Sequence, residues 1–178
     1  GYRRGTLRTV AGRPGMGKSI HLVNESMHIA AMGYYVAIFS LEMPANEIIT
    51  RQMSISTQIE TWKLDKNTMS NEELLVLQKF VETSVSTKID IDDSGNIDYL
   101  YLLTQVKKIK LKNQIRDKDC TGLDIVFIDY LQLMKLDNEN RNIGLGEITR
   151  QLKSLSKELD ICIVLYSQLN RSVEGRGG

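Results

Sequence analysis

The sequence predicts an α/β fold in which helices cover both faces of a mostly parallel, doubly wound sheet. Three short runs, at residues 36–39, 125–128 and 161–165, are continuously apolar and rich in β-branched or aromatic residues. Continuous rather than alternating apolarity is typical of strands that are covered on both faces, as in a parallel sheet. Helical patterns lie between these runs, and strands that alternate with helices imply right-handed crossovers.

Two further strands are expected from weaker signals. Residues 6–11, directly before a glycine-rich segment, are the fourth candidate strand. Residues 88–92 are the fifth, and their strand pattern is the weakest. With these two, the sheet is expected to have a strand before the glycine-rich segment and a strand in the middle of the chain.

Apolar residues at helical spacing predict the helices. The clearest pattern places on one face Ile148, Leu152, Leu155 and Leu159, with charged residues on the other. Residues 99–109 carry a similar stripe, and residues 73–85 are apolar enough for a third helix. The pattern of residues 45–55 predicts a fourth helix. Its start after Pro44 is compatible with the tolerance of proline in the first turn of a helix.

Length and composition restrict the class of protein. The 178 residues, 42% of them hydrophobic, are enough to bury one substantial core, so we expect residues 1–178 to form a single domain. The net charge of +1 gives no evidence of a polyanionic partner from bulk electrostatics. No apolar run approaches the length that crosses a bilayer. Cys162 lies within an apolar run, which is typical of a buried free thiol in a reducing compartment. We therefore expect a cytoplasmic location and no membrane partner.

The strongest motif stands between the first expected strand and a helix. It fits the pattern G-x-x-x-x-G-K-[ST] and consists of Gly12, Arg13, Pro14, Gly15, Met16, Gly17, Lys18 and Ser19. Its glycines allow the backbone to turn successive N–H groups inward, which forms an anion site at a helix N-terminus. Lys18 would place a positive charge near the β- and γ-phosphates, and Ser19 would offer its hydroxyl to Mg²⁺. A turn without a ligand needs neither side chain, so the motif predicts a site for ATP and Mg²⁺.

Two carboxylates follow expected strands at the edge where open α/β sheets bind ligands. Asp129 comes directly after residues 125–128 and is a candidate Mg²⁺ ligand, which the phosphate loop favours over a merely solvated strand end. Glu42 follows residues 36–39 by a short turn. Its carboxylate could orient the attacking water and accept its proton. Alternatively, its negative charge could simply interact favourably with the dipole at the N-terminus of the next helix. Chemistry alone leaves both roles of Glu42 open.

An amide ends the last expected strand. Ser167 and Gln168 follow its apolar run, and there the side-chain amide of Gln168 could sense the γ-phosphate. An isolated glutamine would otherwise be interpreted as a surface residue. His21 and His28 share one face of the helix after the loop, without cysteine or carboxylate partners at zinc spacing, so they are expected to be packing or surface residues. Trp62 is expected in the core.

Four blocks in this order resemble the C-terminal motor domain of DnaB-type replicative helicases. They are GRPGMGKS, SLEM, IDYLQLM and SQLNR with a following VEGR. The resemblance covers nearly the whole chain and implies a RecA-like P-loop ATPase fold. It also implies a six-membered ring around single-stranded DNA, ATP hydrolysis between neighbouring subunits, and primase and a helicase loader as partners.

The resemblance assigns roles to the candidate residues. Glu42 becomes the catalytic base, Asp129 the Walker B metal ligand and Gln168 the γ-phosphate sensor, with Lys18 completing the catalytic set. In similar helicases a loop after the Walker B strand faces the central channel, so Lys135 and Arg141 are candidate DNA contacts.

The chain also departs from the family, because it ends at Gly178. In the family a further stretch supplies a DNA-contacting loop and an arginine finger, and a primase-interacting domain precedes the motor. An arginine finger contributes about 10³ to 10⁵ in rate in other P-loop enzymes, so the isolated chain is expected to hydrolyse ATP weakly or not at all. Two alternatives stay open: a RecA-like recombinase or clock-type ATPase, and a nucleotide-binding assembly module without turnover.

Overall fold

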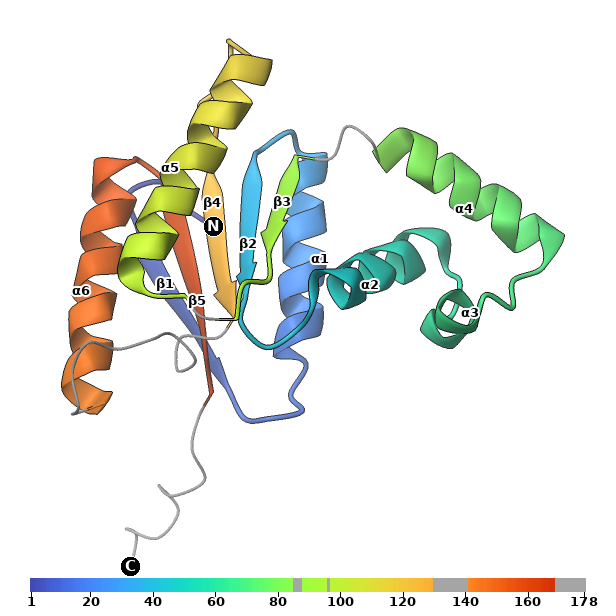
Figure 1. Cartoon of the computed structure of the whole chain (residues 1–178), viewed down its shortest axis with the longest axis horizontal. Helices are drawn as coiled ribbons and strands as arrows, with labels where there is room; N and C mark the ends of the chain where they lie inside the picture. Colours follow the sequence, from blue (N-terminus) through green and yellow to red (C-terminus); the bar gives the residue numbers. More distant parts are fainter. Residues whose placement is uncertain (85–87, 96, 130–140, 169–178) are drawn as a thin grey trace, which may run out of the picture.

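The computed structural model describes residues 1–84, 88–95, 97–129 and 141–168 of the chain (Figure 1). The strands are β1 (Leu7–Gly12), β2 (Val36–Ser40), β3 (Ile89–Asp92), β4 (Ile125–Asp129) and β5 (Cys162–Gln168). The helices are α1 (Lys18–Ala31), α2 (Ala45–Thr57), α3 (Thr61–Lys66), α4 (Asn71–Ser84), α5 (Tyr99–Arg116) and α6 (Arg141–Glu158).

The five strands form one sheet in the order β1-β5-β4-β2-β3, and each neighbouring pair is parallel. This confirms the predicted parallel α/β sheet, including the weak strand at residues 88–92. Because every strand runs the same way, all the carboxyl ends meet at one edge, which is the lower edge in Figure 1. β2, β4 and β5 lie inside the sheet and are apolar on both faces, as their continuous runs predicted.

Each face of the sheet has its own hydrophobic core, which explains the lack of alternation in the central strands. Helices α5 and α6 pack on one face, where Leu102, Val106, Leu152 and Leu155 are fully buried. Helix α1 covers the other face, and α2 joins it through Ile48. Figure 1 shows the two groups of helices on opposite sides of the sheet. The sheet edge that carries the site is thus held between two packed layers.

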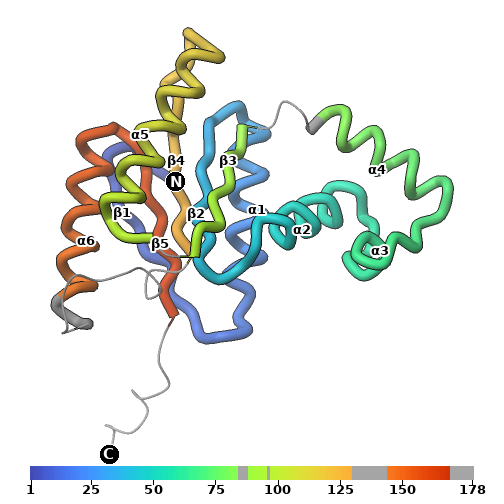
Figure 2. Tube along the Cα trace, viewed as in Figure 1, coloured from blue at the N-terminus to red at the C-terminus, as the bar shows by residue number. Residues whose placement is uncertain are grey.

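Helices α3 and α4 extend from α2 away from the sheet (Figure 2). The predicted helix at residues 73–85 is confirmed as α4, but α3 was not predicted. With only six residues and none of them buried, α3 has no apolar stripe that a sequence pattern could reveal. The expectation for Trp62 is wrong, since its side chain lies on this outlying helix and the residue is 51% exposed.

Helix α5 begins with a side-chain cap. The Asp98 carboxylate accepts a hydrogen bond of 2.7 Å from the backbone N–H of Tyr101, and the preceding Ile97 is buried in the same core as Leu102. This arrangement satisfies one unpaired N–H and fixes the direction in which the chain enters the helix.

Replacing the α5 cap is expected to cost about 1 kcal/mol in the free energy of unfolding. The change is Asp98→Ala, and urea unfolding followed by circular dichroism measures it. Asp98→Asn keeps an acceptor at the same place and should cost only a small part of that. An equal loss for both substitutions would contradict the capping role.

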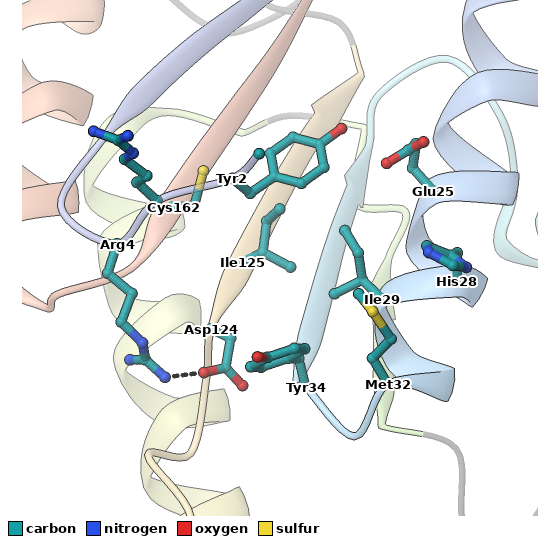
Figure 3. Close-up of a pocket in the computed structure, with 12 residues that line it drawn as sticks. Tyr2, Arg4, Glu25, His28, Ile29, Met32, Tyr34, Asp124, Ile125 and Cys162 are labelled. Atoms are coloured by element: carbon teal, nitrogen blue, oxygen red, sulfur yellow. Dashed lines mark hydrogen bonds and ion pairs between the residues drawn. The ribbon is translucent and has the colours of Figure 1, made fainter.

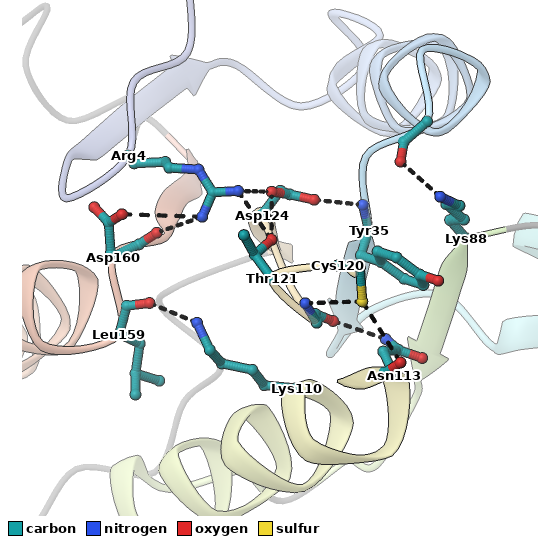
Figure 4. Close-up of polar contacts among 12 residues, drawn as sticks. Arg4, Tyr35, Lys88, Lys110, Asn113, Cys120, Thr121, Asp124, Leu159 and Asp160 are labelled. Carbon is teal, nitrogen blue, oxygen red and sulfur yellow. Dashed lines mark hydrogen bonds and ion pairs between the residues drawn. The ribbon is translucent and has the colours of Figure 1, made fainter. Parts of the chain in front are cut away.

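The amino edge of the sheet, opposite the phosphate loop, is tied by polar contacts (Figure 4). Arg4 forms an ion pair with Asp124 and donates a hydrogen bond of 2.9 Å to Thr121. Asp124 also accepts the backbone N–H of Tyr35 at 2.7 Å. These contacts join the start of the chain to the segments before β2 and β4. Because the charged side chains pair with each other, this edge has a structural role.

Both cysteines of the chain, Cys120 and Cys162, are free thiols, and Cys162 is buried as predicted. No helix in the described part of the chain is both long and apolar enough to cross a membrane.

Candidate functional site

The glycine-rich motif forms the turn from β1 to α1 at the carboxyl edge of the sheet. The predicted strand and helix flank the motif: β1 ends at Gly12 and α1 begins at Lys18. Gly15 and Gly17 have φ values of 76° and 78°, a left-handed conformation that side-chain-bearing residues rarely adopt. Gly17 is the residue before the first turn of α1, where the unpaired N–H groups of a helix attract anions. The local backbone therefore has the form that phosphate binding requires.

Lys18 is held at the mouth of this turn. Its Nζ atom donates hydrogen bonds to the carbonyl oxygens of Gly12, at 3.0 Å, and Arg13, at 3.1 Å. The ammonium group thus lies over the loop that should receive the phosphates. A cation at this place would neutralise part of the charge of a bound polyphosphate.

Ser19 and Asp129 meet although they are far apart in the sequence. The Ser19 hydroxyl donates to Oδ2 of Asp129 over 3.4 Å, a long hydrogen bond. Asp129 ends β4 and is only 2% exposed, and no described residue hydrogen-bonds its other oxygen, Oδ1. A buried carboxylate oxygen without a partner is costly unless something else binds there.

The surroundings of Asp129 change its acidity. Burial, followed by the negative charge of Glu42, raises the pKa of Asp129 from 3.8 to about 6, against smaller opposing effects of Lys18 and Ser19. The ionised carboxylate is therefore an unfavourable state that a cation at this place would relieve.

A tight turn after β2 brings Glu42 to the same edge. The Ser40 hydroxyl donates to the carbonyl oxygen of Met43 at 2.7 Å and accepts from its backbone N–H at 3.2 Å. The backbone N–H of Leu41 donates to the carbonyl oxygen of Asp129 at 2.7 Å, which ties this turn to the end of β4. Glu42 itself is exposed, so its carboxylate is open to water.

Most of the predicted residues converge on one cleft of about 270 Å³. Asp129 is not one of its lining residues, but it contacts Ser19, which is. Gln168 belongs to the cleft because it ends β5 and pairs in register with Gly12. The cleft is lined by Pro14, Gly15, Gly17, Lys18, Ser19, Ile20, Glu42, Arg51 and Gln168. Of the eight motif residues, Gly12, Arg13 and Met16 do not line it, and the Met16 side chain is exposed.

Arg51 is a cleft residue that the sequence did not reveal. It lies on α2 and forms an ion pair of 2.5 Å with Glu47, one helical turn earlier. In the sequence this spacing is typical of a solvated helix face, so it carried no functional signal. Only the packing of α2 against α1 places Arg51 beside the phosphate loop.

The donor set of the cleft fits Mg²⁺ with a polyphosphate. A serine hydroxyl and an aspartate carboxylate are hard oxygen ligands of the kind that Mg²⁺ uses when phosphate oxygens and waters complete its shell. The unpartnered, buried Oδ1 of Asp129 is the observation that supports this fit. Clusters of three or more metal-ligating side chains, such as a zinc site requires, are absent from the described residues.

A larger hollow of about 510 Å³ lies at the opposite edge of the sheet (Figure 3). It is lined by residues at the amino ends of β2, β4 and β5, including Tyr34, Asp124 and Cys162. Asp124 is already paired with Arg4, as Figure 3 shows. Ligands of open α/β sheets bind beyond the carboxyl ends of the strands, so the smaller cleft is the candidate site.

The two candidate DNA contacts fall where side chains are not described. Lys135 lies outside the described residues, and Arg141 is the first residue of α6, with its side chain outside them as well. Both assignments therefore stay predictions.

Comparison with known proteins gives one family for the whole chain. The model of the family described as the DnaB-like helicase C terminal domain matches residues 1–178. The replicative DNA helicase DnaB of Nostoc sp. (strain PCC 7120) is 36% identical over 177 residues, which cover 99% of this chain and 20% of the relative. DnaB of Buchnera aphidicola subsp. Acyrthosiphon pisum is 34% identical over 181 residues, which cover 99% of this chain and 38% of the relative. The chain thus spans well under half of these relatives.

Solved structures agree with the observed topology. One solved ATPase domain superimposes with a TM-score of 0.87 at 29% identity, over 99% of this chain and 61% of that one. A DnaB-like replicative helicase, described together with its interactions with primase, superimposes with a TM-score of 0.86 at 29% identity, over all of this chain and 42% of that one.

Proposed function

Because the chain belongs to the DnaB-like helicase C-terminal domain family, we propose that residues 1–178 are a RecA-like ATPase domain that drives a replicative DNA helicase. The observation that carries this proposal is one cleft lined by a phosphate loop, a solvent-open carboxylate and a strand-end amide, with the buried carboxylate of Asp129 in contact with Ser19 of that loop. These groups come from four strand ends that only the parallel sheet brings together.

The loop and its lysine would bind the triphosphate. Backbone N–H groups at the start of α1 attract anionic oxygens, and Lys18 adds a full positive charge within reach of the loop. Ser19 and Asp129 would hold Mg²⁺, which neutralises developing charge on phosphate oxygens when it is bound. The raised pKa of Asp129 is consistent with a carboxylate that is most stable beside a cation.

Glu42 is proposed to activate the attacking water. Its exposed carboxylate would accept a proton as the water oxygen forms a bond to the γ-phosphorus and the bond from that phosphorus to the β-bridging oxygen breaks, which yields ADP and phosphate. Gln168, opposite Gly12 on β5, would donate its amide N–H to the γ-phosphate. Arg51 would supply a second cation on the side of α2.

The partners of the whole helicase are proposals that rest on the family. We infer single-stranded DNA as the track, a ring of six copies as the assembly, and primase and a loader as further partners. The structure of a related helicase described with its primase interactions supports the primase proposal. A cytoplasmic location and a single domain over residues 1–178 also stay predictions.

The alternatives from the sequence are less well supported. A recombinase or clock-type ATPase would share the fold, but the matching family and the named relatives are helicases. An assembly module without turnover would not need Lys18, Ser19, Glu42 and Asp129 together at one edge of the sheet.

Nucleotide binding by the chain itself tests the proposal. Lys18→Ala is expected to weaken Mg-ATP binding by about tenfold to a hundredfold, because charge-assisted bonds to phosphate contribute roughly 1.5–3 kcal/mol. Isothermal titration calorimetry measures this on the 178-residue chain.

Lys88→Ala is the matched control, since Lys88 also donates to a backbone carbonyl at 3.0 Å, that of Gly33, at the other edge of the sheet. Its affinity for Mg-ATP should equal that of the unchanged protein. No binding heat with Mg-ATP or ADP in well-folded protein, together with no effect of Lys18→Ala, would refute the proposed site.

A further inference from the structure

A hydrogen bond joins the phosphate-loop helix to the strand that carries Gln168. Nδ1 of His21, in the first turn of α1, lies 2.8 Å from the hydroxyl oxygen of Tyr166 on β5. The two rings meet edge to face, with centroids 6.0 Å apart. This contact connects residues 145 positions apart and crosses from the loop side of the site to the strand side.

Tyr166 and Gln168 lie on the same face of β5, because side chains of a strand alternate between its two faces. Cys162, Val164 and Tyr166 all belong to the core beneath α1, and Gln168 continues that series at the cleft. Tyr166 is therefore the last core residue below the proposed phosphate sensor. In register, Tyr166 pairs with Val10 and Gln168 with Gly12, so both are opposite the strand that enters the loop.

Tyr166 is well placed to act as an anchor. Its side chain is completely buried, and its ring packs against Phe127 with centroids 6.3 Å apart. Burial raises the pKa of Tyr166, with smaller contributions from nearby acidic groups, so the hydroxyl keeps its proton and can donate. His21 is exposed, but its backbone N–H is fixed by a bond of 2.9 Å to the carbonyl oxygen of Gly17 in the loop.

We propose that His21 and Tyr166 are positioning residues, whose hydrogen bond holds the end of β5 at a set distance from the phosphate loop and so places the Gln168 amide for a γ-phosphate. This inference rests on the proposed function of Gln168. A diphosphate would not reach the sensor, so the pair should affect triphosphate binding selectively. A purely structural contact would change the binding of ATP and ADP alike, through stability of the fold.

The test compares the affinities of the chain for Mg-ATPγS and Mg-ADP, measured by calorimetry. Tyr166→Phe removes the hydroxyl and keeps the ring, and His21→Leu removes the ring nitrogen at an exposed position. Each is expected to lower the preference for ATPγS over ADP by about threefold to tenfold, the range that one hydrogen bond of ordinary strength allows. His21→Asn, which offers a polar atom near the place of Nδ1, should keep the preference within about twofold.

Tyr35→Phe is the matched control. Tyr35 is also a buried tyrosine whose hydroxyl donates to a side chain, that of Asp117 at 3.1 Å, but it lies at the amino edge of the sheet. Loss of its hydroxyl should leave the preference unchanged. Thermal unfolding of each variant shows whether it is folded, and His21→Leu keeps the test valid if Tyr166→Phe does not fold.

Gln168→Ala separates the sensor role from the positioning role. If Gln168→Ala lowers the preference for ATPγS while Tyr166→Phe and His21→Leu do not, the sensor role stands and the positioning role is overturned. If Gln168→Ala itself has no effect, the sensor role fails and the inference fails with it. A loss of preference in Tyr166→Phe and His21→Leu that His21→Asn does not show supports the positioning role.

Discussion

Replacing Glu42 with glutamine is expected to lower ATP turnover of the full-length helicase by about 10² to 10⁴, the usual contribution of a general base. Mg-ATP affinity should stay within about twofold, because an amide of the same shape keeps the turn between β2 and α2. The turn depends on Ser40 and Met43 rather than on the Glu42 side chain. The expected result is thus a protein that still binds nucleotide but hydrolyses it far more slowly.

Steady-state phosphate release and nucleotide titration, measured on the same preparation, test this result. Glu82→Gln is a suitable control, because Glu82 is an exposed carboxylate on α4, which extends away from the sheet. It should leave both quantities unchanged. Equal turnover in Glu42→Gln and the unchanged helicase would mean that Glu42 only favours the start of α2, and it would rule out the proposed base.

Asp129→Asn is expected to stabilise the nucleotide-free protein while it weakens Mg-ATP binding. Burial and the charge of Glu42 raise the pKa of Asp129 from 3.8 to about 6. The folded protein therefore holds the proton more tightly than the unfolded chain, and stability falls as the pH rises from about 4 to about 6. Above that window the ionised Asp129 costs on the order of 3 kcal/mol in the free energy of unfolding, which asparagine avoids.

The pH dependence distinguishes this effect from a general gain in packing. Urea unfolding in metal-free buffer should show the advantage of Asp129→Asn at about pH 7.5 and its disappearance near pH 4, where the aspartate is protonated in the folded state. Asp119→Asn, at an exposed position, is the control and should show no such difference. A constant advantage across this range, or a loss of stability at the higher pH, would contradict the raised pKa of Asp129.

The same substitution should weaken Mg-ATP binding at least tenfold if Asp129 holds the metal. A gain in the stability of the free protein together with a loss of Mg-ATP affinity is specific to a metal ligand. If Asp129 served only the stability of the fold, its replacement would destabilise the protein. Buried charge that lowers stability in the free protein is typical of a group that is placed for a ligand.

Much of the fold and of the site could be predicted from the sequence. The strands that form the middle of the sheet are continuous apolar runs because helices cover both faces, and that pattern is visible in one dimension. Glu42, Asp129 and Gln168 belong to the candidate site because each stands at or just after a strand end, and parallel strands bring their carboxyl ends to one edge. Lys18 and Ser19 belong to it because they begin the helix after the phosphate loop that follows β1.

The features that the sequence did not predict depend on how whole helices pack. Helix α3 and the exposed Trp62 lie on an outlying part that shares neither sheet core, so neither periodicity nor residue type indicated their environment. Arg51 has the sequence context of a surface helix residue, and its place in the cleft depends on how α2 packs against α1.

By itself the sequence determined the class of fold, the phosphate loop and the carboxylates that follow the strands, because these depend on local patterns of a few residues. Only the tertiary structure decided which side chains meet: the contact of Ser19 with Asp129, the buried oxygen of Asp129, Arg51 beside the loop and His21 against Tyr166. Such contacts join residues from separate helices and strands. Their geometry is set by the packing of whole elements on the sheet, which no short stretch of sequence contains.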